Sequence, residues 1–119
     1  MEGISSEASS LAGHLALNNL VLIYDANKVT LDGFLEESCS EDTKMRYRSY
    51  GWDVYDIDGY DFDKMQQVFS EIRDHQERPC LIMMHTIIGK GSPNKAGTHK
   101  VHGSPLGPEE VEADRKSVV

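Results

Sequence analysis

Cysteine is rare in this sequence, and long apolar runs are absent. No stretch approaches the roughly 18 apolar residues of a membrane-spanning helix, and the N-terminus lacks the basic and then apolar pattern of a secretory signal. The two cysteines, Cys39 and Cys80, lie far apart and match no zinc or redox spacing, so we interpret them as free thiols of a reducing compartment. These absences predict a soluble, cytoplasmic protein with no membrane partner.

Positive charge is also scarce. Lys and Arg number 12 against 20 Asp and Glu, which gives a formal net charge of -8. Binding to DNA or RNA phosphates needs a basic face, and none is visible, so nucleic acid is excluded as the main partner. The hydrophobic fraction of 39% and the charged fraction of 27% are ordinary for a folded chain, and 119 residues suffice for one domain with one modest core.

Apolar runs alternate with segments of helical spacing along the chain. The runs, which predict buried strands, are Leu20–Tyr24, Trp52–Ile57 and Cys80–Met84. Helices are expected over 2–17, 41–50, 62–76 and 108–116. This order predicts an α/β fold with three layers, in which helices flank a parallel sheet joined by right-handed crossovers.

Two oxygen-bearing groups follow the first predicted strand. Residues 25–27 are expected to form a turn there, and open α/β sheets bind ligands at the carboxyl ends of their strands. The side-chain oxygen of Asn27 and the backbone carbonyl of Val29 could face one hard cation such as Mg²⁺, which also accepts phosphate oxygens. Two neutral oxygens do not hold Mg²⁺ alone, so the metal would also need a carboxylate ligand. The alternative is that Asn27 only forms a turn.

Glycine and proline crowd residues 89–107, which predicts a long loop that begins at the carboxyl end of the third strand. The loop contains His99 and His102. Histidine transfers protons near neutral pH and can donate to a phosphate or a sugar hydroxyl. A zinc site is disfavoured because no Cys or carboxylate partner stands at suitable spacing. A functional loop and a solvated, inert histidine pair both fit these residues.

Several segments taken together resemble the transketolase family. They stand in the family's order and spacing, and their combination is far more specific than any single motif: Met1–His14, Tyr24–Gly33, Tyr50–Trp52, Thr86–Gly97 and Val101–Leu106. The resemblance implies that residues 1–119 are part of the amino-terminal, pyrophosphate-binding domain, with 89–107 as its Gly-rich active-site loop.

The resemblance implies an enzyme that uses thiamine diphosphate and transfers a two-carbon ketol unit from a ketose phosphate to an aldose phosphate in the pentose phosphate pathway. Asn27 matches the family's metal-binding asparagine, and Val29 matches the residue whose carbonyl joins it around Mg²⁺ or Ca²⁺. His102 matches the histidine that contacts the cofactor diphosphate and the substrate, and it is the expected catalytic residue. Ile88 and Leu31 match positions that contact or flank the cofactor ring.

Two acidic residues, Glu2 and Glu7, stand near the start of the first predicted helix. Acidic groups there interact favourably with the helix dipole, which is the simplest explanation from the residues alone. The resemblance implies a different role, because both residues match glutamates near the interface of the family's homodimer, where its two cofactor sites are linked.

The beginning of the chain departs from the family pattern. The family's Gly-Asp-Gly run, whose aspartate is the charged metal ligand, would stand just ahead of Met1, and the glutamate of the pyrimidine-binding domain has no match. We therefore expect the isolated chain to be inactive. The alternative is a non-catalytic interaction module or a subunit of a split thiamine diphosphate enzyme. A related enzyme such as dihydroxyacetone synthase would differ in its acceptor.

Overall fold

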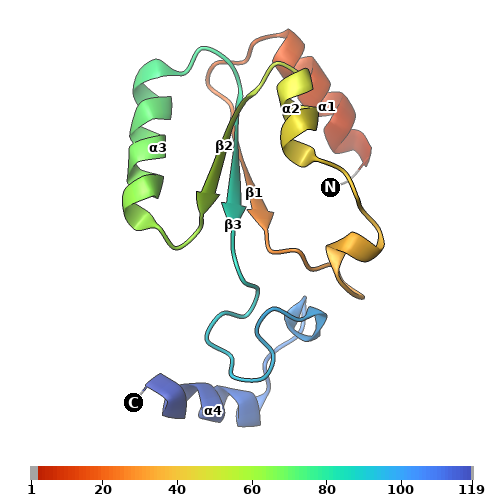
Figure 1. Ribbon diagram of the computed structural model, residues 1–119, viewed down its shortest axis with the longest axis vertical. Coiled ribbons are helices and arrows are strands. Elements are labelled where there is room, and N and C mark those ends of the chain that lie inside the picture. Colours follow the sequence, from red (N-terminus) through yellow and green to blue (C-terminus); the bar gives the residue numbers. More distant parts are fainter. Residues whose placement is uncertain (1–2, 119) are drawn as a thin grey trace. The chain divides into compact units, whose positions relative to one another are not determined.

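The computed structural model describes residues 3–118, and within them it has a three-stranded sheet with helices on both faces (Figure 1). The strands are β1 (Val21–Ala26), β2 (Asp53–Asp58) and β3 (Cys80–His85). They run parallel in the order β1-β3-β2, with Ala26 and Asp58 both opposite His85. The four α-helices are α1 (Gly3–His14), α2 (Thr43–Ser49), α3 (Phe62–His75) and α4 (Pro108–Val118), and two short 3-10 helices are η1 (Leu35–Glu37) and η2 (His99–Val101).

Alternate side chains of β3 point into two separate cores. On one face, Leu81 and Met83 pack with residues of α1, α2 and the start of β2, and on the other, Cys80 and Ile82 pack with residues of α3. Figure 1 shows α3 on one side of the sheet and α1 and α2 on the other. The predicted three-layer α/β fold with a parallel sheet is therefore confirmed.

Helix α1 packs closely because its side chains are small. A Cβ added at Gly13 would lie 1.8 Å from the backbone oxygen of Tyr50. The buried hydroxyl of Ser9 donates to the Tyr47 hydroxyl over 3.0 Å, and the carbonyl of Ser9 accepts from the indole nitrogen of Trp52 over 2.8 Å. These contacts attach α1 to α2 and to the start of β2.

The prediction that the first strand is buried is wrong. Leu22 is 37% exposed and Ile23 is 49% exposed, because β1 lies at one edge of the sheet and pairs only with β3 among the described strands. The strand also ends later than expected, since Asp25 and Ala26 belong to β1 and the turn begins at Asn27. An apolar run predicts a strand, but it does not say on how many sides neighbours cover that strand.

The described residues divide into two compact units. The first contains the sheet with α1, α2 and α3, and consists of residues up to 26 together with 41–85. The second consists of residues 27–40 and the chain from 86 onward. Between residues 3 and 118, no helix is long and apolar enough to cross a membrane. Cys39 and Cys80 are free thiols, as predicted.

Candidate functional site

The turn after β1 fixes the position of the Asn27 side chain. The backbone N–H of Val29 donates to Asn27 Oδ1 over 3.0 Å, and Lys28 between them has a positive φ of 63°. Val29 also forms an antiparallel bridge with Phe34, and the Thr30 N–H donates to the Gly33 carbonyl over 2.8 Å. The expected turn at Asn27 is therefore present, and its hydrogen bonds orient the half-buried amide that was predicted to bind metal.

The Gly-rich loop is held by hydrogen bonds within its own segment. The N–H of Gly97 donates to the carbonyl of Ile88 over 2.8 Å, and Lys95 Nζ donates to the carbonyl of Leu106 over 2.6 Å. Gly89 has a φ of 63°, and a Cβ there would lie 3.0 Å from the Val101 side chain. A close approach of backbone to side chain thus explains why this position is glycine.

His102 follows η2 and has a buried ring nitrogen. Its backbone N–H donates to the His99 carbonyl over 2.9 Å, which fixes the main chain. Its side-chain Nδ1 is buried and makes no hydrogen bond to any described residue. Leaving such a group unpaired costs about 1–3 kcal/mol, so buried polar atoms of this kind are normally satisfied by protein, water or ligand. His102 is therefore the residue in this loop with a buried polar atom that a water molecule or a ligand would have to satisfy.

A second anchor of the loop was not singled out by the sequence analysis. Glu110, in the first turn of α4, is only 7% exposed. Its carboxylate accepts hydrogen bonds from the Ser92 hydroxyl, from the Asn94 N–H over 2.8 Å and from Asn94 Nδ2 over 3.2 Å. These bonds, with that of Ser92 first, lower the pKa of Glu110 to about 2. The sequence shows only that Glu110 stands in the first turn of a helix, where acidic residues interact favourably with the helix dipole.

The second compact unit brings together most of the predicted site residues. It contains the turn residues Asn27, Val29 and Leu31 and the loop residues Ile88 and His102. Leu31 is 63% exposed and Ile88 is half-buried, so both have surface available for contact.

Two glutamates, Glu2 and Glu7, were expected at a dimer interface. Glu7 belongs to the other unit and is exposed on α1. Glu2 lies outside the described residues.

The donor set in the turn suits a hard cation but is incomplete by itself. Asn27 offers an amide oxygen and Val29 a backbone carbonyl, which are ligand types that Mg²⁺ and Ca²⁺ prefer. Across residues 3–118 there is no group of three or more His, Cys, Asp or Glu side chains that could hold a metal. The two oxygens fit a metal that is also bound by a diphosphate and by a carboxylate from elsewhere.

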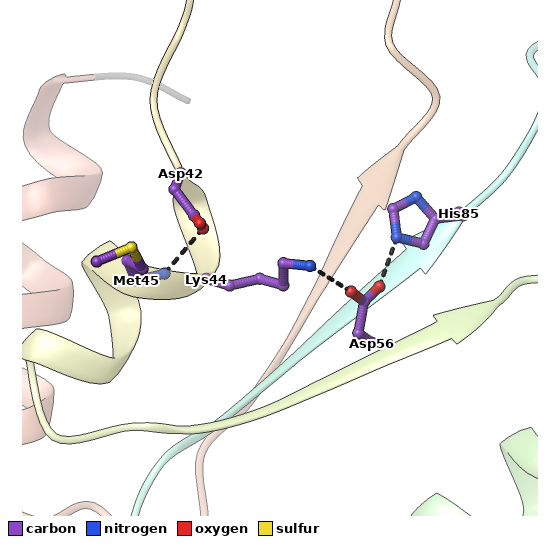
Figure 2. A network of polar contacts seen from close by, with 5 residues as sticks. All are labelled: Asp42, Lys44, Met45, Asp56 and His85. Atoms are coloured by element: carbon purple, nitrogen blue, oxygen red, sulfur yellow. Dashed lines mark hydrogen bonds and ion pairs between the residues drawn. The ribbon is translucent and has the colours of Figure 1, made fainter.

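A separate polar cluster lies at the carboxyl ends of β2 and β3. Figure 2 shows Asp56 between Lys44 of α2 and His85, with Asp42 capping α2 nearby. Lys44 Nζ donates to Asp56 Oδ2 over 2.6 Å, and His85 Nε2 donates to Asp56 Oδ1 over 2.5 Å. The bond from Lys44 is the largest cause of the lowered pKa of Asp56. Each partner in this cluster is matched within the chain, so it indicates a structural role.

The family model described as "Transketolase, thiamine diphosphate binding domain" matches residues 1–118. This chain belongs to the transketolase family, through its thiamine diphosphate-binding domain.

Curated transketolases and solved structures match over nearly the whole chain. The transketolase of Bacillus subtilis is 47% identical over 118 residues, and transketolase 1 of Escherichia coli is 48% identical over 119 residues; the matches cover 98% and 99% of this chain. The crystal structure of transketolase from Campylobacter jejuni has a TM-score of 0.91 at 38% identity and also covers 98% of this chain. A transketolase from Pichia stipitis, solved in complex with sedoheptulose 7-phosphate, has a TM-score of 0.91 at 41% identity over 98% of this chain.

The matched region is a small part of each relative. This chain spans 18% of the length of the Bacillus subtilis and Escherichia coli enzymes, and 18% of the chains of the two crystal structures. The fold and the family are therefore established for the segment.

Proposed function

We propose that this chain is the part of a transketolase that binds the diphosphate end of thiamine diphosphate, with residues 89–107 as its active-site loop. The complete enzyme would transfer a two-carbon ketol unit from a ketose phosphate to an aldose phosphate. The family membership of residues 1–118 and the sugar phosphate bound to the relative from Pichia stipitis support this activity. The single observation that carries the site is the buried, unpaired Nδ1 of His102.

The turn residues would hold the metal. Asn27 Oδ1 and the carbonyl of Val29 would bind Mg²⁺ or Ca²⁺ together with diphosphate oxygens. The hydrogen bond of 3.0 Å between these two residues keeps the amide in one orientation, so less conformational freedom is lost on binding. Leu31 and Ile88 would lie against the cofactor ring, because both carry apolar side chains with surface still available.

The loop histidine would position the diphosphate and the sugar. An imidazole nitrogen that is already buried gains a hydrogen bond without a large new desolvation cost, so His102 is suited to donate to a phosphate oxygen or a substrate hydroxyl. Its backbone bond to His99 fixes the main chain at His102 relative to η2. When bound, the thiamine ring supplies the electron sink of the reaction, whereas the protein supplies binding and orientation.

The remaining features of the complete enzyme belong to the same proposal. It would act as a homodimer in the cytoplasm, within the pentose phosphate pathway, with Glu7 of α1 at the interface. The exposure of Glu7 and of its neighbour Ile4, which is 77% exposed, supports a contact surface on this helix.

Replacing His102 in the full-length enzyme tests the proposal. His102→Ala should raise the Kd for thiamine diphosphate and lower ketol transfer from xylulose 5-phosphate, because it removes one positioned hydrogen bond worth about 1–3 kcal/mol. His99→Ala is the matched control, since His99 is exposed in the same loop and should have little effect. Equal kinetics and equal cofactor affinity in the His102 variant and the unmodified enzyme would refute the assignment.

A second candidate is a subunit of a split thiamine diphosphate enzyme, in which a separate chain supplies the rest of the protein. An apolar hollow of about 310 Å³ favours it, because residues of α1 and β1 line this hollow and Leu22 and Ile23 are among them. Co-purification of this chain with a second chain that carries a pyrimidine-binding domain would support this candidate. A single reading frame that continues on both sides of the segment would exclude it.

A further inference from the structure

Glu110 makes three hydrogen bonds to one short part of the Gly-rich loop. Its Oε1 accepts from the Ser92 hydroxyl and from the Asn94 N–H, and its Oε2 accepts from Asn94 Nδ2. Ser92 is 6% exposed and Glu110 is 7% exposed, so the bond between their side chains is shielded from water. Because the pKa of Glu110 is lowered to about 2, the carboxylate is charged at neutral pH and its hydrogen bonds are charge-assisted.

The anchored part of the loop is connected to the segment that carries His102. Ser92 Oγ also accepts from the Lys95 N–H over 3.2 Å, so the hydroxyl links Glu110 to Lys95. Lys95 Nζ in turn donates to the carbonyl of Leu106 over 2.6 Å. Residues 95–106 are therefore closed into a ring, and His102 lies within that ring.

Two further hydrogen bonds connect the loop to its own first residues, and one of them starts from Gly97 within the ring. Gly97 bonds to Ile88 over 2.8 Å, and Ser92 N–H bonds to the Gly89 carbonyl over 3.0 Å. Neither bond reaches α4. Glu110 is the carboxylate through which the first turn of α4 holds both Ser92 and Asn94.

We propose that Glu110 is a positioning residue for the cofactor diphosphate: through Ser92, Asn94 and Lys95 it fixes the ring that presents His102. This inference rests on the proposed function of His102. Glu110 itself touches neither cofactor nor substrate, and its effect passes through the loop. The sequence offers a matched comparison, because Glu109 stands in the same helical turn but is exposed and forms no bond to the loop in the described structure.

Binding of inorganic pyrophosphate with Mg²⁺ to the cofactor-free, full-length enzyme measures this role without catalysis. Glu110→Gln keeps the side-chain shape, but it removes the charge and places an amide donor beside the donors of Ser92 and Asn94. We expect the Kd for pyrophosphate to rise about tenfold and amide hydrogen exchange at residues 94, 95 and 97 to accelerate at least tenfold. Exchange within β3 should stay unchanged, and Glu109→Gln should match the unmodified enzyme.

A double variant separates positioning from general stability. If Glu110 acts through His102, adding Glu110→Gln to His102→Ala should raise the Kd for pyrophosphate no further than His102→Ala alone. Additive losses would overturn the inference, as would faster loop exchange in Glu110→Gln with an unchanged Kd.

Two further results keep this inference distinct from the proposed function. Unchanged pyrophosphate affinity in His102→Ala would overturn the proposed role of His102 itself. A loss in His102→Ala with none in Glu110→Gln would overturn only the positioning role of Glu110. Ser92→Ala gives the same test if the Glu110 variant does not fold. This substitution should raise the Kd for pyrophosphate by a smaller factor and accelerate amide exchange at residue 95. No change in either quantity would contradict the inference.

Discussion

Asp56 and His102 are both polar side chains that the fold partly covers. They differ in whether the described residues provide hydrogen-bond partners for them. Both oxygens of Asp56 accept hydrogen bonds, from Lys44 and from His85. The buried Nδ1 of His102 has no such partner among the described residues. A satisfied group contributes to the stability of the fold, whereas an unsatisfied one has a cost that a ligand can remove.

The lowered pKa of Asp56 predicts a pH dependence of stability. In the folded protein, the pKa of Asp56 lies below its ordinary value of 3.8. The stabilisation that the Asp56 carboxylate contributes is therefore fully present above pH 3.8, and it is lost as the pH falls through the lowered pKa. Asp56→Asn should therefore lower the urea midpoint at pH 7 and leave it nearly unchanged at the acid limit. Urea titrations between pH 2 and 7 measure this effect, with the exposed Asp32→Asn as control. Equal losses by Asp56→Asn at all pH values would contradict the expectation.

Some residues of the candidate site were predictable from sequence and others were not. Asn27 and His102 were predicted because they follow strands in the sequence and because their motifs resemble those of transketolases, and their roles stay predictions. Glu110 was missed because an acidic residue in a first helical turn already has a local explanation in the helix dipole. Its three bonds to Ser92 and Asn94 depend on how the loop folds back, which residue spacing does not determine.

At the scale of helices and strands, periodicity predicted where the elements begin and end better than it predicted their burial. Helix α3 was expected over 62–76 and spans Phe62–His75, and the third strand begins at Cys80 as expected. The burial of β1 was wrongly predicted because Leu22 and Ile23 form an apolar run regardless of whether one or two strands flank it. Periodicity is a property of neighbouring residues, whereas the burial of a strand depends on residues that are distant in sequence.

The close approach of α1 to residue 50 predicts a sharp difference between two glycines of this helix. Gly13→Ala would place a methyl group 1.8 Å from the Tyr50 carbonyl, so the helix must move and the protein should lose about 1–3 kcal/mol of stability. Gly3→Ala meets no atom within 4 Å and should be neutral or slightly stabilising. Thermal unfolding of the two variants side by side measures this difference. A Gly13→Ala protein as stable as its Gly3→Ala counterpart would show that α1 is not packed as described.

At the scale of the whole molecule, the chain covers only 18% of its transketolase relatives. Within the described residues, β1 has one strand neighbour and leaves apolar side chains partly exposed. Unpaired strand edges of this kind form hydrogen bonds with other chains. We therefore expect the isolated chain to lack ketol transfer and to self-associate, and the first expectation is checked by assaying it with xylulose 5-phosphate, thiamine diphosphate and Mg²⁺.

The exposed edge gives this self-association a specific test. Ile23→Lys places a charge in the edge strand, where it disfavours pairing with a second chain, so it should shift the isolated chain towards monomer in sedimentation velocity at increasing concentration. Leu31→Lys adds the same charge at a side chain that is 63% exposed and lies outside the sheet. If both substitutions reduce association equally, the change in net charge is responsible and β1 is not the contact.

The two cysteines differ in reactivity because of where the fold places them. Cys80 is 1% exposed in β3, and burial raises the pKa of its thiol to about 11. Cys39 is partly exposed just before α2. Since the thiolate is the reactive form, a maleimide dye would attach to Cys39 and spare Cys80. The native chain thus carries a single fluorescent labelling position, twelve residues beyond the proposed metal ligand Asn27, with no engineered thiol required.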